Sequence, residues 1–136
     1  MTASAPVPPD AEENGLRADP RLLEAVRHFN AGEWYACHDG FEELWQETQG
    51  PMRPVLQGLL QIAVAELHHE RGNRRGATVL MGEGLGRLQC CGQAALGIAL
   101  GPLRDCVAQR LKALQQEGSL FDLPAPRLER EGEEAR

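Results

Sequence analysis

The chain has 136 residues, of which 42% are hydrophobic, enough to bury one core but arguing against two domains. Its 20 acidic and 14 basic residues give a net charge of -6, opposite in sign to a typical nucleic-acid-binding domain, so nucleic acid is not an expected partner. No apolar run approaches the roughly 18 residues of a membrane span, and residues 1–20 lack the features of a signal peptide. We therefore expect a soluble, cytoplasmic protein without a membrane partner.

The first part of the chain divides into a tail and a short helix. Residues 1–19 are rich in proline, alanine and acids and carry little to bury, which predicts a disordered tail. From Pro20, which suits a first helical turn, apolar residues recur at helical spacing until the break at residues 30–32. This pattern predicts an amphipathic helix; its apolar residues are Leu22, Leu23, Val26 and Phe29.

Residues 33–46 predict a second helix with an aromatic face. Five of the six aromatic residues of the chain fall in or just before this helix, so the face that carries them is expected to be buried. On a helical projection, His38 and Glu42 lie on the same side as Trp34 and Trp45. We therefore expect His38 and Glu42 to be inside the protein with the tryptophans.

Residues 54–71 predict the central helix, which is apolar nearly all round and is therefore expected to be buried. Three polar side chains share one narrow stripe on it: Gln57, Gln61 and His68. Each buried polar group left without a partner costs about 1–3 kcal/mol, so these three need partners inside the protein. Glu66, in contrast, is expected to face water.

The segment after the central helix predicts a helical corner. Gly72 can adopt the left-handed conformation that ends a helix, and Asn73 can cap the next one. Residues 77–91 then predict a fourth helix that contains three glycines, each costing about 1 kcal/mol relative to alanine. This cost predicts close packing of the backbone at the glycines, which are Gly82, Gly84 and Gly86.

The last third predicts one more helix and a second tail. Residues 92–101 lack a clear period and predict a packed loop, and a helix is expected from Pro102 to near Gly118. Residues 122–136 resemble the first tail in composition and predict disorder. No segment alternates as a strand does. The expected fold is all-α: a single-domain bundle of about five helices over residues 20–121, with disordered N- and C-terminal tails.

Three motifs in order carry a family resemblance: FNAGEWYACHDGFEELW, QGLLQIAVAELH and RGNRRGA. Over about residues 29–88 the chain resembles domain-of-unknown-function family 309, small all-helical proteins of bacteria and archaea. The resemblance implies a helical fold and a shared polar cluster, but no activity. This chain departs from the family at Asp39, where the family usually has glutamate, and position 39 is expected to project away from the cluster. The matching positions are His38, Glu42, Trp45, Gln57, Gln61, His68, Gly72, Asn73, Gly76 and Ala77.

The polar cluster has two interpretations. As a hydrogen-bonded network between two helices it would explain every unusual residue, since buried polar groups are usually satisfied. As a functional site, His38, Glu42 and His68 could hold a divalent metal or perform acid–base chemistry, with the glutamines around them. No HExxH motif supports the metal, and the network is favoured, so neither metal nor cofactor is expected.

Two classes of function follow from these interpretations. The first is a non-catalytic binding or scaffolding module, with an unidentified protein or small molecule as partner. The second is a small metal-dependent or acid–base enzyme, hydrolase-like, that uses His38, Glu42 and His68. The sequence does not decide whether the chain is an enzyme, and its oligomeric state is open, with a homodimer as one alternative. Trp34, Trp45 and Asn73 are expected to support the cluster.

Three arginines beside the start of the fourth predicted helix suggest a weaker site. The free N–H groups of a helix N-terminus favour anions, so a small phosphate or carboxylate could bind beside Arg71, Arg74 and Arg75. Solvated arginines at a turn are the simpler explanation.

Overall fold

The computed structural model describes residues 10–132 and confirms the all-α fold class. Residues 1–9 and 133–136, the outer parts of the two expected tails, lie outside the described residues. Within residues 10–132, no helix combines the length and the apolar character needed to cross a membrane. The elements are α1 (Ala11–Ala18), α2 (Pro20–Asn30), α3 (Trp34–Glu47), α4 (Arg53–Glu70), α5 (Arg74–Gln89), β1 (Ala94–Ala95), β2 (Ile98–Ala99) and α6 (Leu100–Gln115).

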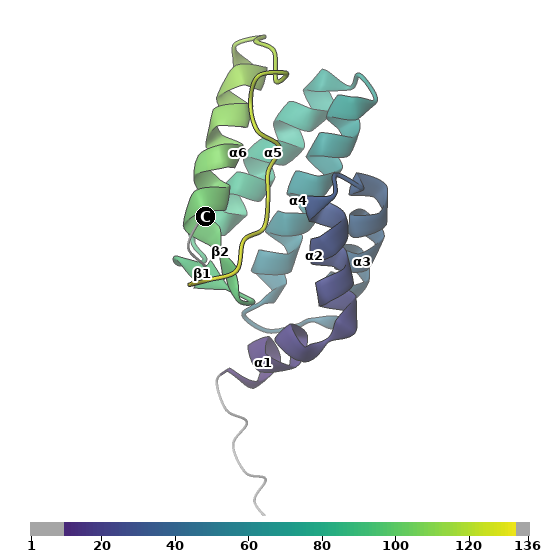
Figure 1. Cartoon of the computed structure of the whole chain (residues 1–136), viewed down its shortest axis with the longest axis vertical. Coiled ribbons are helices and arrows are strands. Elements are labelled where there is room, and N and C mark those ends of the chain that lie inside the picture. Colours follow the sequence, from purple (N-terminus) through teal and green to yellow (C-terminus); the bar gives the residue numbers. More distant parts are fainter. Residues whose placement is uncertain (1–9, 133–136) are drawn as a thin grey trace, which may run out of the picture.

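The helix α4 lies at the centre of the bundle. It packs against α3 and α5, while α2 packs against α3 and α6 against α5 (Figure 1). This placement follows from its sequence, because a helix that is apolar nearly all round needs neighbours on several sides. Trp34 and Phe41 of α3 are buried as expected, with Phe29 of α2 edge-on to Trp34 at 5.0 Å between ring centroids, whereas Trp45 is half-buried and Tyr35 is exposed. Fully buried side chains of this core include Phe29, Phe41, Leu56, Leu59, Ile62, Met81, Leu88 and Leu103.

The turns follow the expected chemistry. Gly32 and Gly72 have positive φ angles of 72° and 77°, which end α2 and α4. Asn73 caps α5, because its side-chain oxygen accepts a hydrogen bond from the backbone N–H of Gly76 at 2.9 Å. The segment expected as a packed loop forms a small hairpin, β1 and β2, whose turn places Leu96 and Gly97 at positive φ.

Only one of the three glycines expected to mark close packing on α5 does so tightly. A Cβ atom added to Gly84 would lie 3.0 Å from the backbone oxygen of Gly58, so these two glycines let α4 and α5 approach. Gly82 has its nearest neighbour at 4.0 Å, and Gly86 has none within 4 Å. The expectation of close packing at Gly86 was therefore wrong.

Glu66 does not face water, which corrects the sequence-based expectation. Its residue is 3% exposed, and its carboxylate accepts hydrogen bonds from Nε of Arg110 at 3.0 Å and from Nη2. Arg110, on α6, is 5% exposed and also donates through Nη1 to the carbonyl of Pro124 at 3.1 Å. A buried charge must be paired, and this bidentate pair meets that requirement for both residues.

The described part of the N-terminal tail is a helix, not a disordered segment. Within α1, Glu12 accepts hydrogen bonds from the backbone N–H groups of Gly50 and Met52 at 2.8 and 2.7 Å. Glu13 accepts one from the N–H of Leu96 at 2.7 Å. Leu16 is buried against the core. Two carboxylates and one leucine therefore dock α1 on the bundle. The composition of residues 1–19 could not indicate these specific contacts.

The second tail is also part of the fold as far as residue 132. Residues 119–132, here called the C-terminal segment, run back along the bundle to the hairpin (Figure 1). Leu120 and Leu128 are buried, and Asn30 bonds both backbone groups of Leu128, at 3.0 and 2.7 Å. Gly97 accepts a hydrogen bond from the N–H of Glu131 at 2.8 Å. Two leucines and a polar clasp are enough to order a segment that looks disordered by composition.

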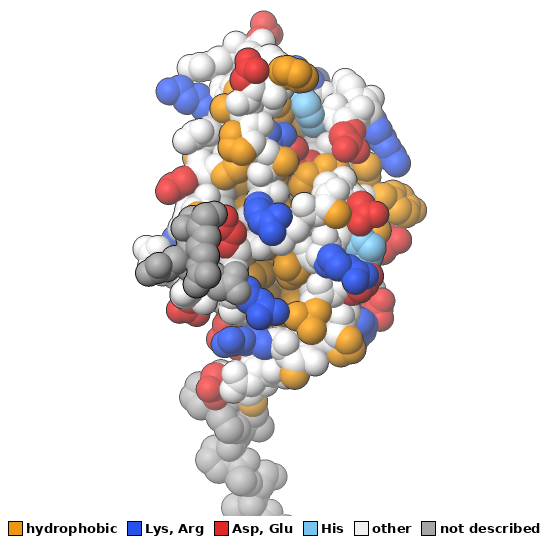
Figure 2. Space-filling model, in the orientation of Figure 1, with side chains coloured by type: hydrophobic (Ala, Val, Ile, Leu, Met, Phe, Trp, Pro, Cys, Tyr) orange, Lys and Arg blue, Asp and Glu red, His pale blue; other side chains and the backbone are white. Residues whose placement is uncertain are grey.

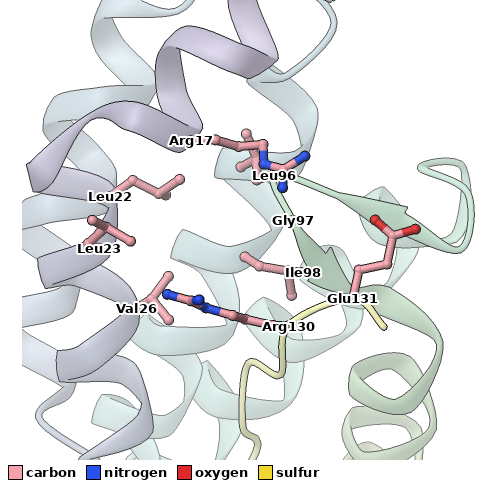
Figure 3. A pocket seen from close by; sticks show the side chains of 9 residues that line it. All are labelled: Arg17, Leu22, Leu23, Val26, Leu96, Gly97, Ile98, Arg130 and Glu131. Atoms are coloured by element: carbon pink, nitrogen blue, oxygen red, sulfur yellow. The ribbon is translucent and has the colours of Figure 1, made fainter. Parts of the chain in front are cut away.

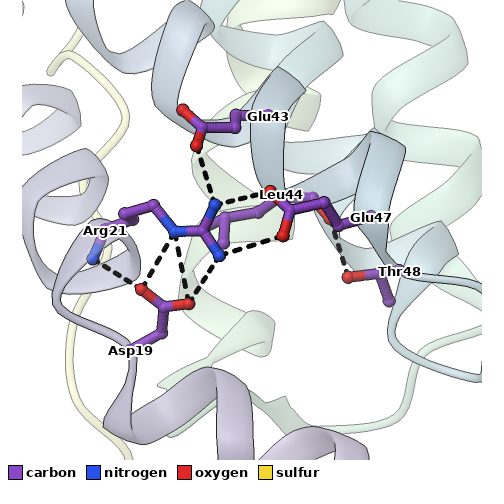
Figure 4. Close-up of polar contacts among 6 residues, drawn as sticks. All are labelled: Asp19, Arg21, Glu43, Leu44, Glu47 and Thr48. Carbon is purple, nitrogen blue, oxygen red and sulfur yellow. Dashed lines mark hydrogen bonds and ion pairs between the residues drawn. The ribbon is translucent and has the colours of Figure 1, made fainter.

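Arg21 connects the start of α2 to the end of α3 (Figure 4). Its guanidinium donates to Asp19 at 2.9 Å, to Glu43 at 2.7 Å and to Glu47 at 2.5 Å. Asp19 also caps α2 by accepting from the backbone N–H of Arg21 at 2.9 Å. The hydrogen bonds from Arg21 hold the pKa of both Asp19 and Glu47 below their ordinary values of 3.8 and 4.5.

These lowered pKa values predict a pH-dependent contribution to stability. A carboxylate with a folded-state pKa below its unfolded value stabilises the fold fully above the unfolded value and loses this contribution as pH falls through the folded value. The stability advantage of the wild type over Arg21→Gln should therefore be constant from about pH 7 to pH 5.5 and shrink below about pH 4.5. Urea unfolding across this range measures it.

A matched control for this titration is Arg75→Gln. Arg75 is exposed, and its side chain forms no hydrogen bond or ion pair with any other residue from 10 to 132. Its effect on stability should show no comparable step below about pH 4.5. An advantage over Arg21→Gln that grows as the pH falls would contradict the prediction.

Candidate functional site

The candidate site is built around His38 on α3. The Nε2 atom of His38 lies 3.1 Å from Oε2 of Glu42, and its Nδ1 atom lies 3.1 Å from Oδ1 of Asp39. One ligand atom from each of these residues can be chosen so that all three lie within 4.8 Å of one another. We call His38, Asp39 and Glu42 the His38 group. It combines one imidazole and two carboxylates within little more than one helical turn.

The His38 group is half-buried, which differs from the expected burial. The buried positions of α3 are Trp34, Cys37, Phe41 and Leu44, spaced three and four apart. His38 follows Cys37 by one residue, a rotation of about 100°, and so lies at the border of the buried face. The side chain of His38 is 28% exposed and that of Glu42 is 39% exposed. A ligand from solution can reach this site.

Asp39 is the member of the site that the sequence reading misplaced. It was expected to project away from the polar cluster, yet its carboxylate contacts the His38 ring. Adjacent residues on a helix diverge, but an imidazole has a nitrogen on each side and can meet a neighbour's carboxylate with one of them.

The other expected members of the cluster lie elsewhere. Gln61 faces α5, where it donates to Glu83 at 3.0 Å and accepts from Arg87 at 2.8 Å. His68 contacts the side chain of Asn73 at 3.1 Å. Gln57 is half-buried and takes part in none of the side-chain hydrogen bonds found among residues 10–132. The α3 and α4 helices pack together, but among residues 10–132 no hydrogen bond links the His38 group to Gln57, Gln61 or His68. The prediction of a hydrogen-bonded network between these helices was therefore wrong.

The two tryptophans occupy different environments. Trp34 is 5% exposed and belongs to the core. Trp45 is half-buried, and the guanidinium of Arg53 lies over its ring at 4.3 Å, a cation–π contact between the end of α3 and the start of α4. Its indole N–H is buried without a hydrogen-bond partner among the described residues. Both tryptophans thus support α3 rather than form a stacking site together.

The three arginines near the start of α5 do not form one site. Arg74 donates to the carbonyls of Ala113 and Gly118, at 3.1 and 2.6 Å, and so caps the end of α6. Arg71 and Arg75 are exposed. The anion site considered as a weaker alternative is therefore not assembled, because its middle residue is used to satisfy backbone carbonyls.

The chemistry of the His38 group fits a divalent metal ion. Imidazole nitrogen and carboxylate oxygen are ligands that zinc, manganese and nickel accept. Three ligands leave further coordination positions open to water or to a ligand oxygen. His68 is not a member of the group, so the three-residue combination assumed for an enzyme is not present.

Comparisons with known proteins identify one matching family and one similar sequence. Residues 22–80 match the model of the family described as "Domain of unknown function (DUF309)". The "Uncharacterized protein YpuF" of Bacillus subtilis (strain 168) is 29% identical over 106 residues, 76% of this chain and 61% of that protein. The chain therefore spans about three fifths of this relative. The matched region contains the whole His38 group, and the match confirms that this chain resembles the DUF309 family.

Proposed function

We propose that this protein is a non-catalytic helical binding module that takes up a divalent metal ion at the His38 group. The observation that carries the proposal is the convergence of one imidazole and two carboxylates to within 4.8 Å at a half-exposed position. Open coordination positions on the ion would then accept an oxygen of a protein or small-molecule partner. The role of α3 is to hold the three ligands on a rigid helix, with the aromatic core behind it.

The partial exposure of the His38 group supports this function over a purely structural network. A network that locks two helices would be buried and would join α3 to α4. The His38 group is half-exposed, and its contacts stay within α3. Exposed ion pairs contribute about 0–1 kcal/mol to stability, so the contacts within the His38 group add little to the stability of the fold.

A cytoplasmic location is part of the same proposal. The four cysteines are free thiols, and Cys90 and Cys91 are adjacent in sequence at the end of α5. Unpaired cysteines suit a reducing compartment, where disulfides are rare. A divalent ion bound through nitrogen and oxygen is compatible with that compartment.

The proposal predicts metal binding that depends on His38. Untagged protein purified without chelators should carry, or take up from added Zn2+, Mn2+ or Ni2+, about one ion per chain. His38→Ala should abolish this binding, and Glu42→Gln should weaken it by about tenfold or more, because even the loss of a residue that only hydrogen-bonds a ligand typically costs about 10–100-fold in metal affinity. Elemental analysis and isothermal titration measure both effects.

The chain offers a matched control in His28. This histidine also contacts two carboxylates, Glu24 at 3.2 Å and Glu33 at 3.1 Å, and its side chain is 26% exposed. Its ligand atoms do not converge as those of the His38 group do. His28→Ala should therefore leave metal uptake unchanged. Equal losses in both variants, or no uptake by the wild type, would contradict the proposal, as would a loss of about 1–3 kcal/mol of stability in metal-free His38→Ala.

A further inference from the structure

A second candidate site lies where the two expected tails meet the bundle. A pocket of about 450 Å³ opens between α1, α2, the hairpin and the C-terminal segment (Figure 3). Its apolar lining includes Leu22, Val26 and Ile98, and also Leu23, which is 53% exposed. This volume lies within the range of about 300–1,000 Å³ that is usual for small-molecule sites.

Two arginines enter this pocket from opposite ends of the chain. Arg17 comes from α1 and Arg130 from the C-terminal segment. In Figure 3, Arg130 reaches toward Val26, while the carboxylate of Glu131 points to the other side. Among residues 10–132, neither guanidinium forms an ion pair or a side-chain hydrogen bond. Figure 2 shows hydrophobic and basic side chains next to each other on the lower half of this face.

The walls of the pocket are held in place by hydrogen bonds. The backbone N–H of Leu96 donates to Glu13 at 2.7 Å, and that of Glu131 donates to the carbonyl of Gly97 at 2.8 Å. Leu96 has a φ of 56°, an unfavourable conformation for a leucine, and its side chain is 4% exposed. Gly97 leaves room for Arg17, since a Cβ there would lie 3.2 Å from Arg17 Nε. These contacts hold the backbone of the hairpin and of the C-terminal segment around the pocket before any ligand arrives.

We propose that this pocket binds a medium-chain aliphatic carboxylate. Arginine matches a carboxylate in geometry and can bind it through two parallel hydrogen bonds. Two arginines that form no ion pair with any residue from 10 to 132, in a chain with a net charge of -6, favour an anion at this point. The leucine, valine and isoleucine side chains beside them favour an aliphatic chain on the same ligand. The pocket is separate from the His38 group, which lies on α3.

Octanoate tests this site in the full-length protein. Isothermal titration should show octanoate binding about tenfold or more tightly than acetate, which lacks the chain, and than octanol, which lacks the charge. The double variant Arg17→Gln/Arg130→Gln should weaken octanoate binding by about tenfold or more. Leu23→Gln, at an exposed position that the fold tolerates, should weaken octanoate binding while leaving acetate unchanged.

The matched control is Arg127→Gln, three residues before Arg130 on the same segment and outside the pocket. This variant should bind octanoate as the wild type does. Thermal melting of each variant without ligand shows whether it is folded. The proposal is overturned if octanoate does not bind, if the double arginine variant binds it as tightly as the wild type, if Arg127→Gln lowers affinity equally, or if octanol or acetate binds as well as octanoate.

Discussion

Replacing Arg110 with alanine should lower the free energy of unfolding by about 3–5 kcal/mol, because the change leaves the Glu66 carboxylate as a buried charge without its partner. Both side chains are nearly inaccessible, at 6% and 4% exposure for Arg110 and Glu66. Arg110 also holds the C-terminal segment through the carbonyl of Pro124. Urea unfolding at neutral pH, followed by circular dichroism, measures the loss.

The double variant Glu66→Leu/Arg110→Met separates the two contributions. Replacing a buried ion pair by apolar residues of similar volume is often neutral or stabilising, so this variant should be more stable than Arg110→Ala. It lacks the bonds from Arg110 to the C-terminal segment, so recovery should be incomplete. Arg21→Gln, which breaks exposed ion pairs, should cost much less than Arg110→Ala. A loss below about 1 kcal/mol in Arg110→Ala would show that the pair does not hold the fold together.

Alanine substitutions at Gly84 and Gly86 should change stability in opposite directions. At Gly84 the new methyl group would meet the Gly58 backbone oxygen at 3.0 Å and the side chain of Ile62 at 3.0 Å. The helices must then separate, and we expect a net loss of about 1–2 kcal/mol. At Gly86 no atom lies within 4 Å, so alanine gains helix propensity and should stabilise by about 0.5–1 kcal/mol.

Thermal and urea unfolding of these two variants gives a comparison within one helix. Both residues are glycines inside α5, so replacing either with alanine brings the same gain in intrinsic helix propensity. The two variants differ only in the surroundings of the added methyl group. If both variants were stabilised, α4 and α5 could separate at no cost and the close approach at Gly58 would not matter. If both were destabilised, the surface position of Gly86 would need another explanation.

The bundle itself could be predicted from the sequence because its helices have clear apolar periods. The burial of α4, the core position of Trp34 and the cap at Asn73 all follow from local rules. Glu66 could have been found by the same rule. It follows Leu59 and Ile62 at spacings of three and four, and Arg110 holds the equivalent place after Leu103 and Val107. Opposite charges on two apolar faces are a signal for a buried pair.

The two ends of the fold gave no comparable signal. The α1 helix buries one leucine, and the C-terminal segment buries two well-separated ones, which is too little to form a period. Polar contacts dock both ends. Glu12 and Glu13 of α1 accept hydrogen bonds from backbone N–H groups, and Asn30 accepts one from the backbone N–H of Leu128, which is distant in sequence. Such contacts depend on the finished bundle. The pocket that contains Arg17 and Arg130 could therefore not be predicted.

The His38 group falls between these cases. His38 and Glu42 share a face because they are four residues apart, and the sequence shows this directly. His38 and Glu42 each follow a buried residue of α3 by one position, and this places them at the border of the buried face. A helical projection is too imprecise to distinguish such a border position from a buried one. The contact with Asp39 depends on the rotation of the imidazole ring, which no spacing rule contains.

The clasp between Asn30 and Leu128 has a consequence for the order of folding. It joins residues 98 positions apart, whereas α4 and α5 are neighbours in sequence joined by a short turn. Closing a long loop costs chain entropy before any contact is gained, so we expect the helical pairs to form first and the C-terminal segment to dock last. Segments that dock last with few apolar contacts also open first in the native state. Because this segment carries Arg130, we expect the pocket to be completed in the final folding step.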